Sequence, residues 1–322
     1  MRRATIIGVG SYLPKKIISN ADLEKTLDTS NEWIVTRSGI HNRHQAAKGE
    51  TTSDLATAAA HSALADAALQ IDDIDLIVVA TTTPDLTFPA TAALVQKKLG
   101  MRHGAAFDVQ AVCSGFVYGL GVVASLLETR QAERALFIGA ETMTRLLDWN
   151  DRSTAVLFGD GAGAVIVEAR DVTPDAPHII SSYLRSDGQL SDILYVDGGV
   201  STNQITGHLT MQGREVFRHA VANISDAILS LLQQSDYKIE DVDWFVPHQA
   251  NKRIIDAVAK KAGLPEGKTI VTIENHANTS AASIPLALHA GVQDGRIQSG
   301  HLVLTEAMGG GLGWGANLIR WA

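Results

Sequence analysis

The sequence contains one cysteine in 322 residues. A single cysteine excludes an internal disulfide framework, which suits a reducing compartment, so we expect a cytoplasmic protein. The cysteine itself is then either an inert buried residue or a nucleophile.

The sequence also lacks a long apolar run and an excess of basic residues. No stretch approaches the roughly 18 apolar residues of a membrane-spanning helix, and the first residues are interrupted by Gly8, Gly10 and Pro14. We therefore expect no targeting segment, no membrane insertion and a first strand near the N-terminus. The formal charge of -8 argues against broad nucleic-acid binding, which needs a concentrated basic surface.

Two common kinds of site are missing as well. His41 and His44 could form half of a metal site, but no cysteine or carboxylate cluster completes a zinc-like set. Gly159, Gly161 and Gly163 do not follow a first strand with the spacing of a dinucleotide-binding turn. The sequence therefore predicts no metal and argues against a nicotinamide dehydrogenase.

What the sequence does contain is a series of short β-branched runs between alanine-rich stretches. The β-branched runs predict strands at 76–79, 136–138, 164–167 and 302–304, and the alanine-rich stretches predict helices at 53–70 and 216–233. With 45% hydrophobic and 19% charged residues, the chain can bury a large core. The alternation predicts an α/β fold with mostly buried sheets.

The pattern occurs twice. Asp73–Val78 resembles Asp241–Val246, which lies 168 residues later. Each copy follows a helical stretch, and each half closes with a glycine-rich turn and a last strand. We therefore predict two α/β units around a shared core, an N-terminal half over residues 1–172 and a C-terminal half over residues 173–322.

Cys113 stands where an apolar strand runs into the small residues of an expected helix. Unpaired N–H groups and the macrodipole at a helix N-terminus favour the thiolate, which is the reactive form of sulfur. Gly115 would let other backbone approach closely. Two interpretations of Cys113 therefore remain open, a catalytic nucleophile and a small buried side chain.

Two polar residues occupy matching places in the second half. His248 follows the expected strand 244–247, at the edge where α/β enzymes place ligands. Asn278 lies 165 residues after Cys113, in the loop that is its repeat counterpart. Capping or solvent-exposed side chains are the alternative for each. Their joint placement predicts two facing loops, one carrying sulfur and the other an amide.

Four strings carry a resemblance to a known family: Ser30–Arg37, Val246–Asn251, Asn278–Ser283 and Gly309–Gly315. They resemble the β-ketoacyl-acyl-carrier-protein synthase III family of condensing enzymes, and the resemblance runs from near residue 5 to the C-terminus. It implies a homodimer with a duplicated thiolase-like α/β fold in five layers, α-β-α-β-α. It implies no cofactor, because coenzyme A enters as part of the acyl substrate.

The resemblance also implies a reaction. An acyl-coenzyme A primer, acetyl-coenzyme A first among them, would condense with malonyl-acyl-carrier protein and so initiate fatty acid biosynthesis. Cys113 would carry the acyl group, and His248 and Asn278 would donate N–H bonds to the enolate left when carbon dioxide departs. The backbone N–H groups of Cys113 and Gly310 would form the oxyanion hole.

Further residues are implied for the substrates. Trp33 and Arg152 would hold the adenine of coenzyme A, Arg37 would contact its phosphates, and Asn251 would belong to the same site. Phe88 would reach across the dimer to line the partner's acyl tunnel.

A basic face is expected on the helix after His248. Arg253, Lys260 and Lys261 share one side of that helix. With Arg218 they would dock the acidic carrier protein, although a solvated basic face is the alternative.

The sequence departs from the family at a few positions. Ala277 stands where the family usually has glycine, so we expect the loop to avoid a backbone angle reserved for glycine. Gly313 and Ser38 replace common threonines, which leaves the acyl-chain preference open. Two other functions also remain open: a condensing enzyme for secondary-metabolite or long-chain acyl substrates, and a non-catalytic protein that binds acyl-coenzyme A or the carrier protein.

Overall fold

Two sheets organise the chain in the computed structural model, which describes all 322 residues. The first sheet has the strand order β1 (Arg2–Tyr12), β7 (Asp160–Asp171), β6 (Arg134–Thr142), β4 (Leu76–Ala80) and β5 (Ala105–Val109). The second has the order β11 (Trp244–Pro247), β12 (Leu302–Gly309), β13 (Gly313–Arg320) and β8 (His178–Ser186). The expected first strand is β1.

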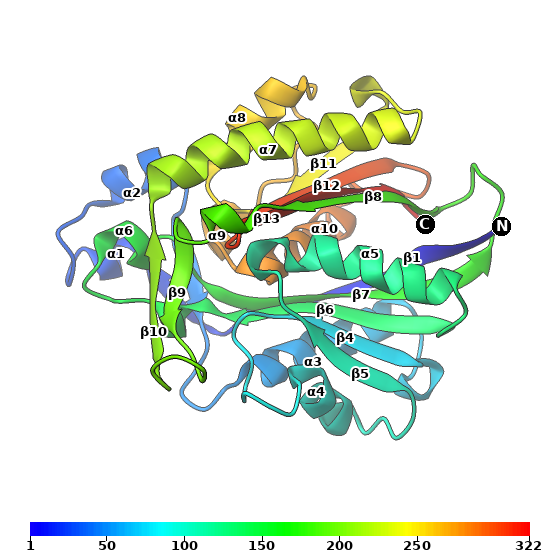
Figure 1. Cartoon of the computed structure of the whole chain (residues 1–322), viewed down its shortest axis with the longest axis horizontal. Coiled ribbons are helices and arrows are strands. Elements are labelled where there is room, and N and C mark those ends of the chain that lie inside the picture. The colour runs from blue at the N-terminus through cyan, green and yellow to red at the C-terminus, as the bar shows by residue number, and fades with distance from the viewer.

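Helices cover both sheets and fill the space between them (Figure 1). The helices are α3 (Thr52–Asp66) and α4 (Thr91–Leu99) outside the first sheet, α5 (Gly115–Glu128) and α10 (Ser283–Gln293) between the sheets, and α7 (Gly213–Gln234) and α8 (Lys252–Ala262) outside the second. The result is five layers, α-β-α-β-α. The expected helices at 53–70 and 216–233 correspond to α3 and α7.

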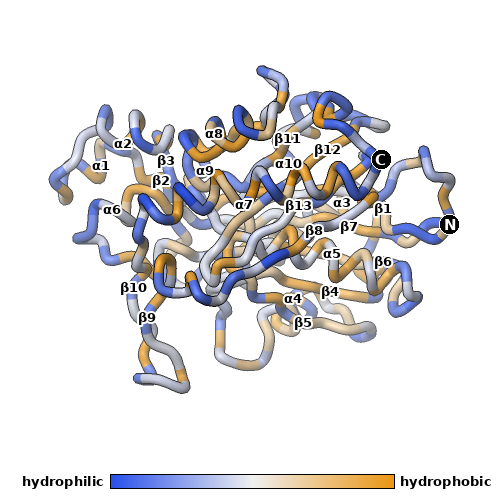
Figure 2. The backbone as a smooth tube through the Cα atoms, turned by 45° about the horizontal axis from the view of Figure 1, so that its top comes forward, coloured by the Kyte–Doolittle hydropathy of each residue, from blue (hydrophilic) through white to orange (hydrophobic).

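Burial explains the strand and helix patterns. Every residue of β4 is buried, as expected for a parallel strand covered on both faces. The largest core cluster lies around α5 and α10, between the sheets, where Phe116 stacks on Phe137 with ring centroids 4.9 Å apart. Figure 2 shows the same contrast, with hydrophobic strands inside and hydrophilic turns outside.

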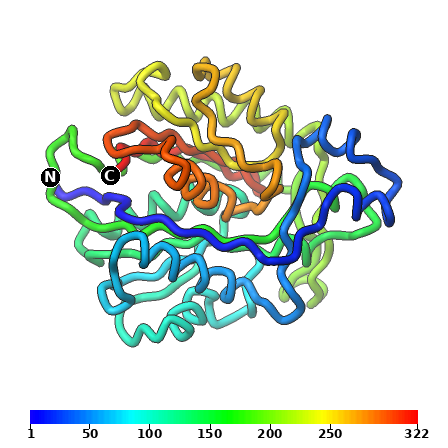
Figure 3. The backbone as a smooth tube through the Cα atoms, turned by 180° about the vertical axis from the view of Figure 1, so that it is seen from behind, coloured from blue at the N-terminus to red at the C-terminus, as the bar shows by residue number.

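The two sheets have matching topologies. In the first, antiparallel β1 and β7 are followed by β6, with β4 and β5 parallel to it. In the second, β8, β13, β12 and β11 repeat the same directions, and the fifth strand is reduced to one parallel bridge from Thr269 to Phe245. Figure 3 shows the later half of the chain above the earlier half. The predicted boundary after residue 172 falls between β7 and β8; as a division into domains it stays a prediction.

The same 3-10 turns recur before corresponding elements. The turn η1 (Ile71–Asp73) precedes β4, and η5 (Ile239–Asp241) precedes β11. The turn η2 (Val112–Ser114) leads into α5, and η6 (Ser280–Ala282) leads into α10. The loops that carry Cys113 and Asn278 are therefore counterparts in the fold, as the repeat predicted.

The remaining elements gather at one end of the layers (Figure 1). They are β2 (Lys16–Ser19), α1 (Asn20–Leu23), α2 (Asn31–Ser38), β3 (Asn42–Gln45), η3 (Met143–Leu146), α6 (Arg152–Ala155), η4 (Gly188–Leu190), β9 (Leu194–Gly198), β10 (Thr206–Met211) and α9 (Ile273–His276). None of the helices combines the length and the apolar composition that crossing a membrane requires.

Candidate active site

Cys113 lies in η2, two residues before the first residue of α5. Its side chain is buried, with 5% of the residue exposed. The preceding residue, Val112, has a φ of +48°, a backbone region that β-branched residues rarely adopt. A strained residue directly before a buried cysteine indicates that the surrounding structure holds the sulfur in a defined position.

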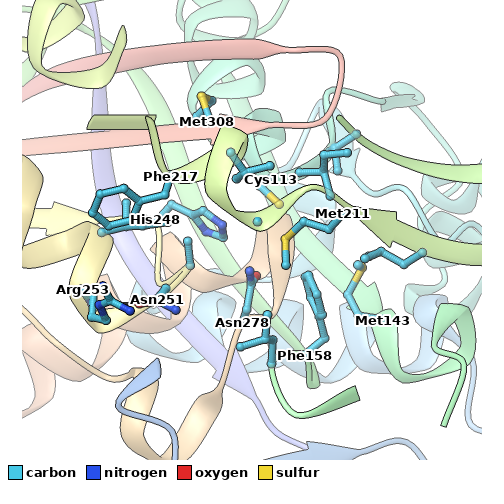
Figure 4. A pocket seen from close by; sticks show the side chains of 18 of the residues that line it. Cys113, Met143, Phe158, Met211, Phe217, His248, Asn251, Arg253, Asn278 and Met308 are labelled. Carbon is cyan, nitrogen blue, oxygen red and sulfur yellow. Dashed lines mark hydrogen bonds between the residues drawn. The ribbon is translucent and has the colours of Figure 1, made fainter. Parts of the chain in front are cut away.

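A cavity of about 690 Å³ opens onto this cysteine. Cys113, His248 and Asn278 all line it, and Figure 4 shows the three side chains pointing toward one another. They come from η2, from the residue after β11 and from the loop between α9 and η6. The structure therefore brings together the three residues predicted as a triad.

His248 is fixed on two sides. Its backbone N–H donates to the Glu306 carbonyl at 2.8 Å, and its Nδ1 lies 2.6 Å from the Ser283 hydroxyl. That hydroxyl accepts from the Gln249 N–H at 3.3 Å, so its own hydrogen is available for Nδ1. Such a bond leaves the ring proton on Nε2. Burial lowers the pKa of His248 to about 3, which keeps the ring neutral at physiological pH.

Asn278 is oriented by its own loop and by the first half of the chain. Its Oδ1 accepts from the Ser280 N–H at 2.9 Å, which leaves the amide N–H groups to face the cavity. Its backbone N–H donates to the Leu157 carbonyl at 2.9 Å, and its carbonyl accepts from the Gly159 N–H at 3.0 Å. Two backbone hydrogen bonds therefore hold this loop of the second half against the first half of the chain.

The backbone of Ala277 differs from the expectation. Its φ of 58° and ψ of -162° lie in a region that is nearly reserved for glycine. The expectation that the loop avoids such an angle is wrong. The bonds of Asn278 to the Leu157 and Gly159 backbone hold the next residue in place, so Ala277 adopts the strained angle despite its Cβ.

Burial also acts on the sulfur. It raises the pKa of Cys113 to about 12, and the nearby Glu141 carboxylate acts in the same direction. The neighbouring Ser280 hydroxyl and the cysteine's own N–H act in the opposite direction on this pKa. Desolvation thus opposes the thiolate that a helix N-terminus favours, and the resting sulfur is a protonated thiol.

The glycine-rich turn after β12 lies close to the cysteine. A Cβ on Gly309 would lie 2.7 Å from the Cys113 backbone nitrogen, so only glycine fits there. Sequence reasoning missed Gly309, although its place in the glycine run was a usable signal. Gly310 lines an adjoining cavity of about 470 Å³ rather than the one that holds Cys113, and its place in an oxyanion hole stays a prediction.

The predicted coenzyme A residues divide into two groups. Arg37 and Asn251 line the cavity, and Asn251 also caps α8 by accepting from the Arg253 N–H at 2.9 Å. Trp33 and Arg152 do not line it. The guanidinium carbons of Arg37 and Arg152 lie 4.6 and 5.2 Å from the Trp33 ring centroid. A purine between Trp33 and Arg152 needs two contacts of about 3.5 Å each, so Arg152 must move outward to admit it.

The predicted basic face is exposed. Arg253, Lys260 and Lys261 lie on the outer side of α8, and Arg253 also reaches the cavity. Arg218 is exposed on α7, paired with Glu215. Arg214, one helical turn before Arg218, lines the cavity; sequence reasoning missed it, although the i, i+4 spacing could have found it.

Phe88 lies outside the cavity of its own chain. It follows β4 in the loop before α4, and 83% of the residue is exposed. Its predicted place in a partner's tunnel stays a prediction.

Comparison with known proteins now identifies the family. The model of 3-oxoacyl-[acyl-carrier-protein] synthase III matches residues 107–188, and the model of its C-terminal part matches residues 232–321. The β-ketoacyl-[acyl-carrier-protein] synthase III of Paramagnetospirillum magneticum is 59% identical over 320 residues, with 99% of each chain covered. The chain belongs to the 3-oxoacyl-[acyl-carrier-protein] synthase III family.

Solved structures agree with this family. The 3-oxoacyl-[acyl-carrier-protein] synthase III of Aquifex aeolicus is 45% identical with a TM-score of 0.93, covering 99% of this chain and 100% of the other. The priming β-ketosynthase of the R1128 polyketide pathway is 34% identical with a TM-score of 0.92, covering 99% and 96%. The predicted family, its thiolase-like fold and its class, acyltransferases that act as condensing enzymes, are confirmed.

Proposed function

We propose that this synthase III family member condenses an acyl-coenzyme A primer with malonyl-acyl-carrier protein to give a 3-oxoacyl-acyl-carrier protein. One observation carries the proposal: a thiol, a neutral imidazole and an oriented amide line one cavity in a chain of this family. Acetyl-coenzyme A as primer, and hence the initiation of fatty acid synthesis, is the form of the reaction that the family resemblance favours.

In the first half-reaction, the Cys113 sulfur attacks the thioester carbon of the primer. The carbon–sulfur bond to coenzyme A then breaks, and free coenzyme A leaves before the second substrate binds. Covalent capture divides one difficult reaction into two easier ones and gives ping-pong kinetics.

In the second half-reaction, malonyl-acyl-carrier protein loses carbon dioxide and leaves an enolate. His248 Nε2–H and the Asn278 amide each donate one hydrogen bond to its oxygen. Two such donors in a dry cavity contribute about 3 kcal/mol each. The low pKa of His248 fits this role, because a neutral ring donates a bond and keeps its proton.

The enolate carbon then attacks the acyl-cysteine carbonyl. The oxyanion that forms there needs backbone donors, for which the Cys113 N–H and Gly310 N–H remain our candidates. This attack forms the new carbon–carbon bond. Collapse of the intermediate then re-forms the carbonyl, breaks the carbon–sulfur bond to Cys113 and releases the cysteine thiolate, which takes up a proton. All bonds form between the substrates and side chains of the chain, so the scheme requires no cofactor.

Positively charged side chains around the cavity are suited to bind both substrates. Arg37, Arg214 and Arg253 line it and can hold the phosphates of coenzyme A and of the carrier's pantetheine arm. Lys260 and Lys261 extend the positive charge outward along α8, toward an acidic carrier protein. A free nucleophilic thiol also suits the reducing cytoplasm.

We also propose that the chain forms a homodimer. Strand β5 is the edge of the first sheet, and none of its residues is buried, although a parallel strand is normally covered. A homodimer would cover this edge and bring Phe88 to a partner. Sedimentation velocity should give about twice the chain mass of 34.3 kDa; a single species of one chain mass contradicts the dimer.

Intact-mass measurement after incubation with acyl-coenzyme A thioesters tests the reaction. We expect one acyl adduct, lost in Cys113→Ala. Asn278→Ala should form the adduct and fail in condensation, because its amide acts only on the enolate. Equal loss of both steps in Asn278→Ala contradicts its role, and the absence of any adduct on the unaltered chain favours a binding protein.

A specialised pathway is the second candidate, since the R1128 priming synthase shares the whole fold. Comparing malonyl-acyl-carrier protein with malonyl-coenzyme A, over a series of primer lengths, separates the two. Preference for acetyl-coenzyme A and the fatty-acid carrier protein supports fatty-acid initiation.

A further inference from the structure

The first half-reaction leaves the cysteine proton without an acceptor. Cys113 is a protonated thiol at rest, because burial raises its pKa to about 12. His248 is a poor acceptor, since its Nδ1 faces the Ser283 hydroxyl and its Nε2 already carries the proton that the enolate needs. Another group must take the proton as the sulfur attacks.

Glu141 lies near the end of β6 and is fully buried. Its carboxylate accepts from the Thr82 N–H at 3.1 Å, from the Thr83 hydroxyl at 2.6 Å and from the Ser280 hydroxyl at 3.0 Å. All of these donors are neutral. A carboxylate held only by neutral donors can change protonation state without breaking an ion pair.

Ser280 connects this carboxylate to the sulfur. It begins η6, which packs against η2, and its hydroxyl donates to Glu141 at 3.0 Å. The same hydroxyl lowers the pKa of Cys113, so it acts on the sulfur as well. Its φ of +50° is unusual for a residue with a side chain. The same residue orients the Asn278 amide through its N–H, so both its backbone and its hydroxyl are held in place next to the cysteine turn η2.

We propose that Glu141 receives the Cys113 proton through the Ser280 hydroxyl during acyl transfer. This step rests on the proposed function. As the sulfur bonds to the thioester carbon, its proton passes to the Ser280 oxygen and the Ser280 proton passes to Glu141. When the bond to coenzyme A breaks, the departing sulfur takes up a proton returned through Ser280. Glu141 ends ionised, as it began.

The electrostatics of Glu141 suit this exchange. Burial raises its pKa to about 7, while the bonds from Thr83, Thr82 and Ser280 act in the opposite direction. A base with a pKa near the working pH is both ionised often enough and basic enough to act. The titratable group that faces it is Cys113, across Ser280.

Alkylation of Cys113 by iodoacetamide tests the relay without any acyl substrate. In the unaltered chain the rate should rise through about pH 7 and then level, because the ionised Glu141 assists above its pKa. Glu141→Gln should remove this inflection and slow alkylation at pH 8 roughly 100-fold. Ser280→Ala should do the same with Glu141 in place.

Two variants separate the relay from a structural effect. Glu141→Asp keeps a carboxylate and should retain the inflection. Asp160→Asn removes another buried carboxyl that holds backbone N–H groups and a threonine hydroxyl, and should leave the inflection unchanged. An unchanged pH profile in both Glu141→Gln and Ser280→Ala overturns the relay. If the relay variants behave as expected while acyl-coenzyme A forms no adduct, the proposed function fails and the relay stands.

Discussion

At the residue scale, four ionisable side chains in and behind the site are almost fully buried, and each pKa shifts toward the neutral form. Burial raises the pKa of Cys113 to about 12, of Glu306 to about 8 and of Glu141 to about 7, and lowers that of His248 to about 3. Neutral groups lose less solvation in a dry cavity. Apart from Glu141, whose pKa lies near the working pH, charge therefore appears in this site mainly during the reaction, where hydrogen-bond donors and acceptors are already positioned.

Glu306 is the one of these four that our mechanism does not use through its side chain. Its Oε2 has no hydrogen-bond partner, and burial is the cause of its raised pKa. A carboxyl whose folded pKa lies above its unfolded value contributes fully to stability below about pH 4.5 and loses that contribution as the pH rises to about 8.

Replacing Glu306 by glutamine should therefore stabilise the folded chain more at pH 8 than at pH 5. Glu306→Gln does not titrate, so its melting temperature relative to the unaltered chain should increase from pH 5 to pH 8, because only the unaltered chain must ionise a buried group. Thermal unfolding at the two pH values measures this. The exposed Glu266→Gln is the control, and an equal difference at both pH values for Glu306→Gln contradicts the expectation.

Sequence reasoning found the residues that follow recognisable strand ends and missed those that act through tertiary contacts. Cys113 and His248 stand after apolar strands, and Asn278 is the repeat counterpart of Cys113. Glu141 lies inside a run that reads only as a buried strand, and Ser283 reads as part of a helix. Their roles depend on contacts with residues 35 to 139 positions away in the chain, which no local pattern encodes.

At the element scale, the buried strands were predictable and the exposed ones were not. Strands β4, β6 and β12 are nearly continuous apolar runs because both faces are covered. Strands β9 and β10 alternate between half-buried or buried and exposed positions, and each is too short for its apolar residues to stand out from the surrounding loops. The η turns before α5 and α10 became predictable only through the repeat.

Close packing between β6 and the Asn278 loop should be sensitive to one methyl group. A Cβ on Gly139 would lie 2.3 Å from the Ala281 carbonyl oxygen, which belongs to η6 and cannot move independently of Ser280. Gly139→Ala should destabilise the chain by about 1–3 kcal/mol and slow both cysteine acylation and condensation. Urea unfolding and the adduct assay measure the two effects.

The matched control is Gly188→Ala, in η4, where an added Cβ meets nothing within 4 Å. It should leave stability and acylation almost unchanged. If Gly139→Ala is equally harmless, β6 does not constrain the loop that carries Asn278 and Ser280.

At the scale of the whole molecule, the active cavity lies where the two matching units meet. One unit supplies Cys113 and Glu141, and the other supplies His248, Asn278 and Ser280. The duplication was visible in the sequence because its strands and turns recur in register. The five-layer packing followed from the family resemblance, since periodicity predicts buried faces and says nothing about which faces meet.

This shared burial gives the molecule opposing pH responses. Burial lowers the pKa of His248 to about 3 and of His276 to about 4, so the unfolded chain binds these protons first, and stability falls as the pH drops below about 6.5. The raised pKa values of Glu141 and Glu306 act the other way, since stability falls as the pH rises above about 4.5. Between these two limits the four effects largely cancel.

Above pH 6.5 the histidines no longer contribute and the two carboxyls act alone. Each carboxyl that is protonated in the folded chain but ionised in the unfolded chain makes the unfolding free energy fall by about 1.4 kcal/mol for every pH unit gained. This fall ends near pH 7 for Glu141 and near pH 8 for Glu306, where each group ionises in the folded chain as well. We therefore expect stability to be nearly level from pH 5 to 6.5 and to decline from pH 6.5 to 8. Urea unfolding at constant ionic strength measures the curve, and a midpoint that increases between pH 6.5 and 8 contradicts it. The decline should become shallower in Glu306→Gln, because one of the two groups responsible is gone.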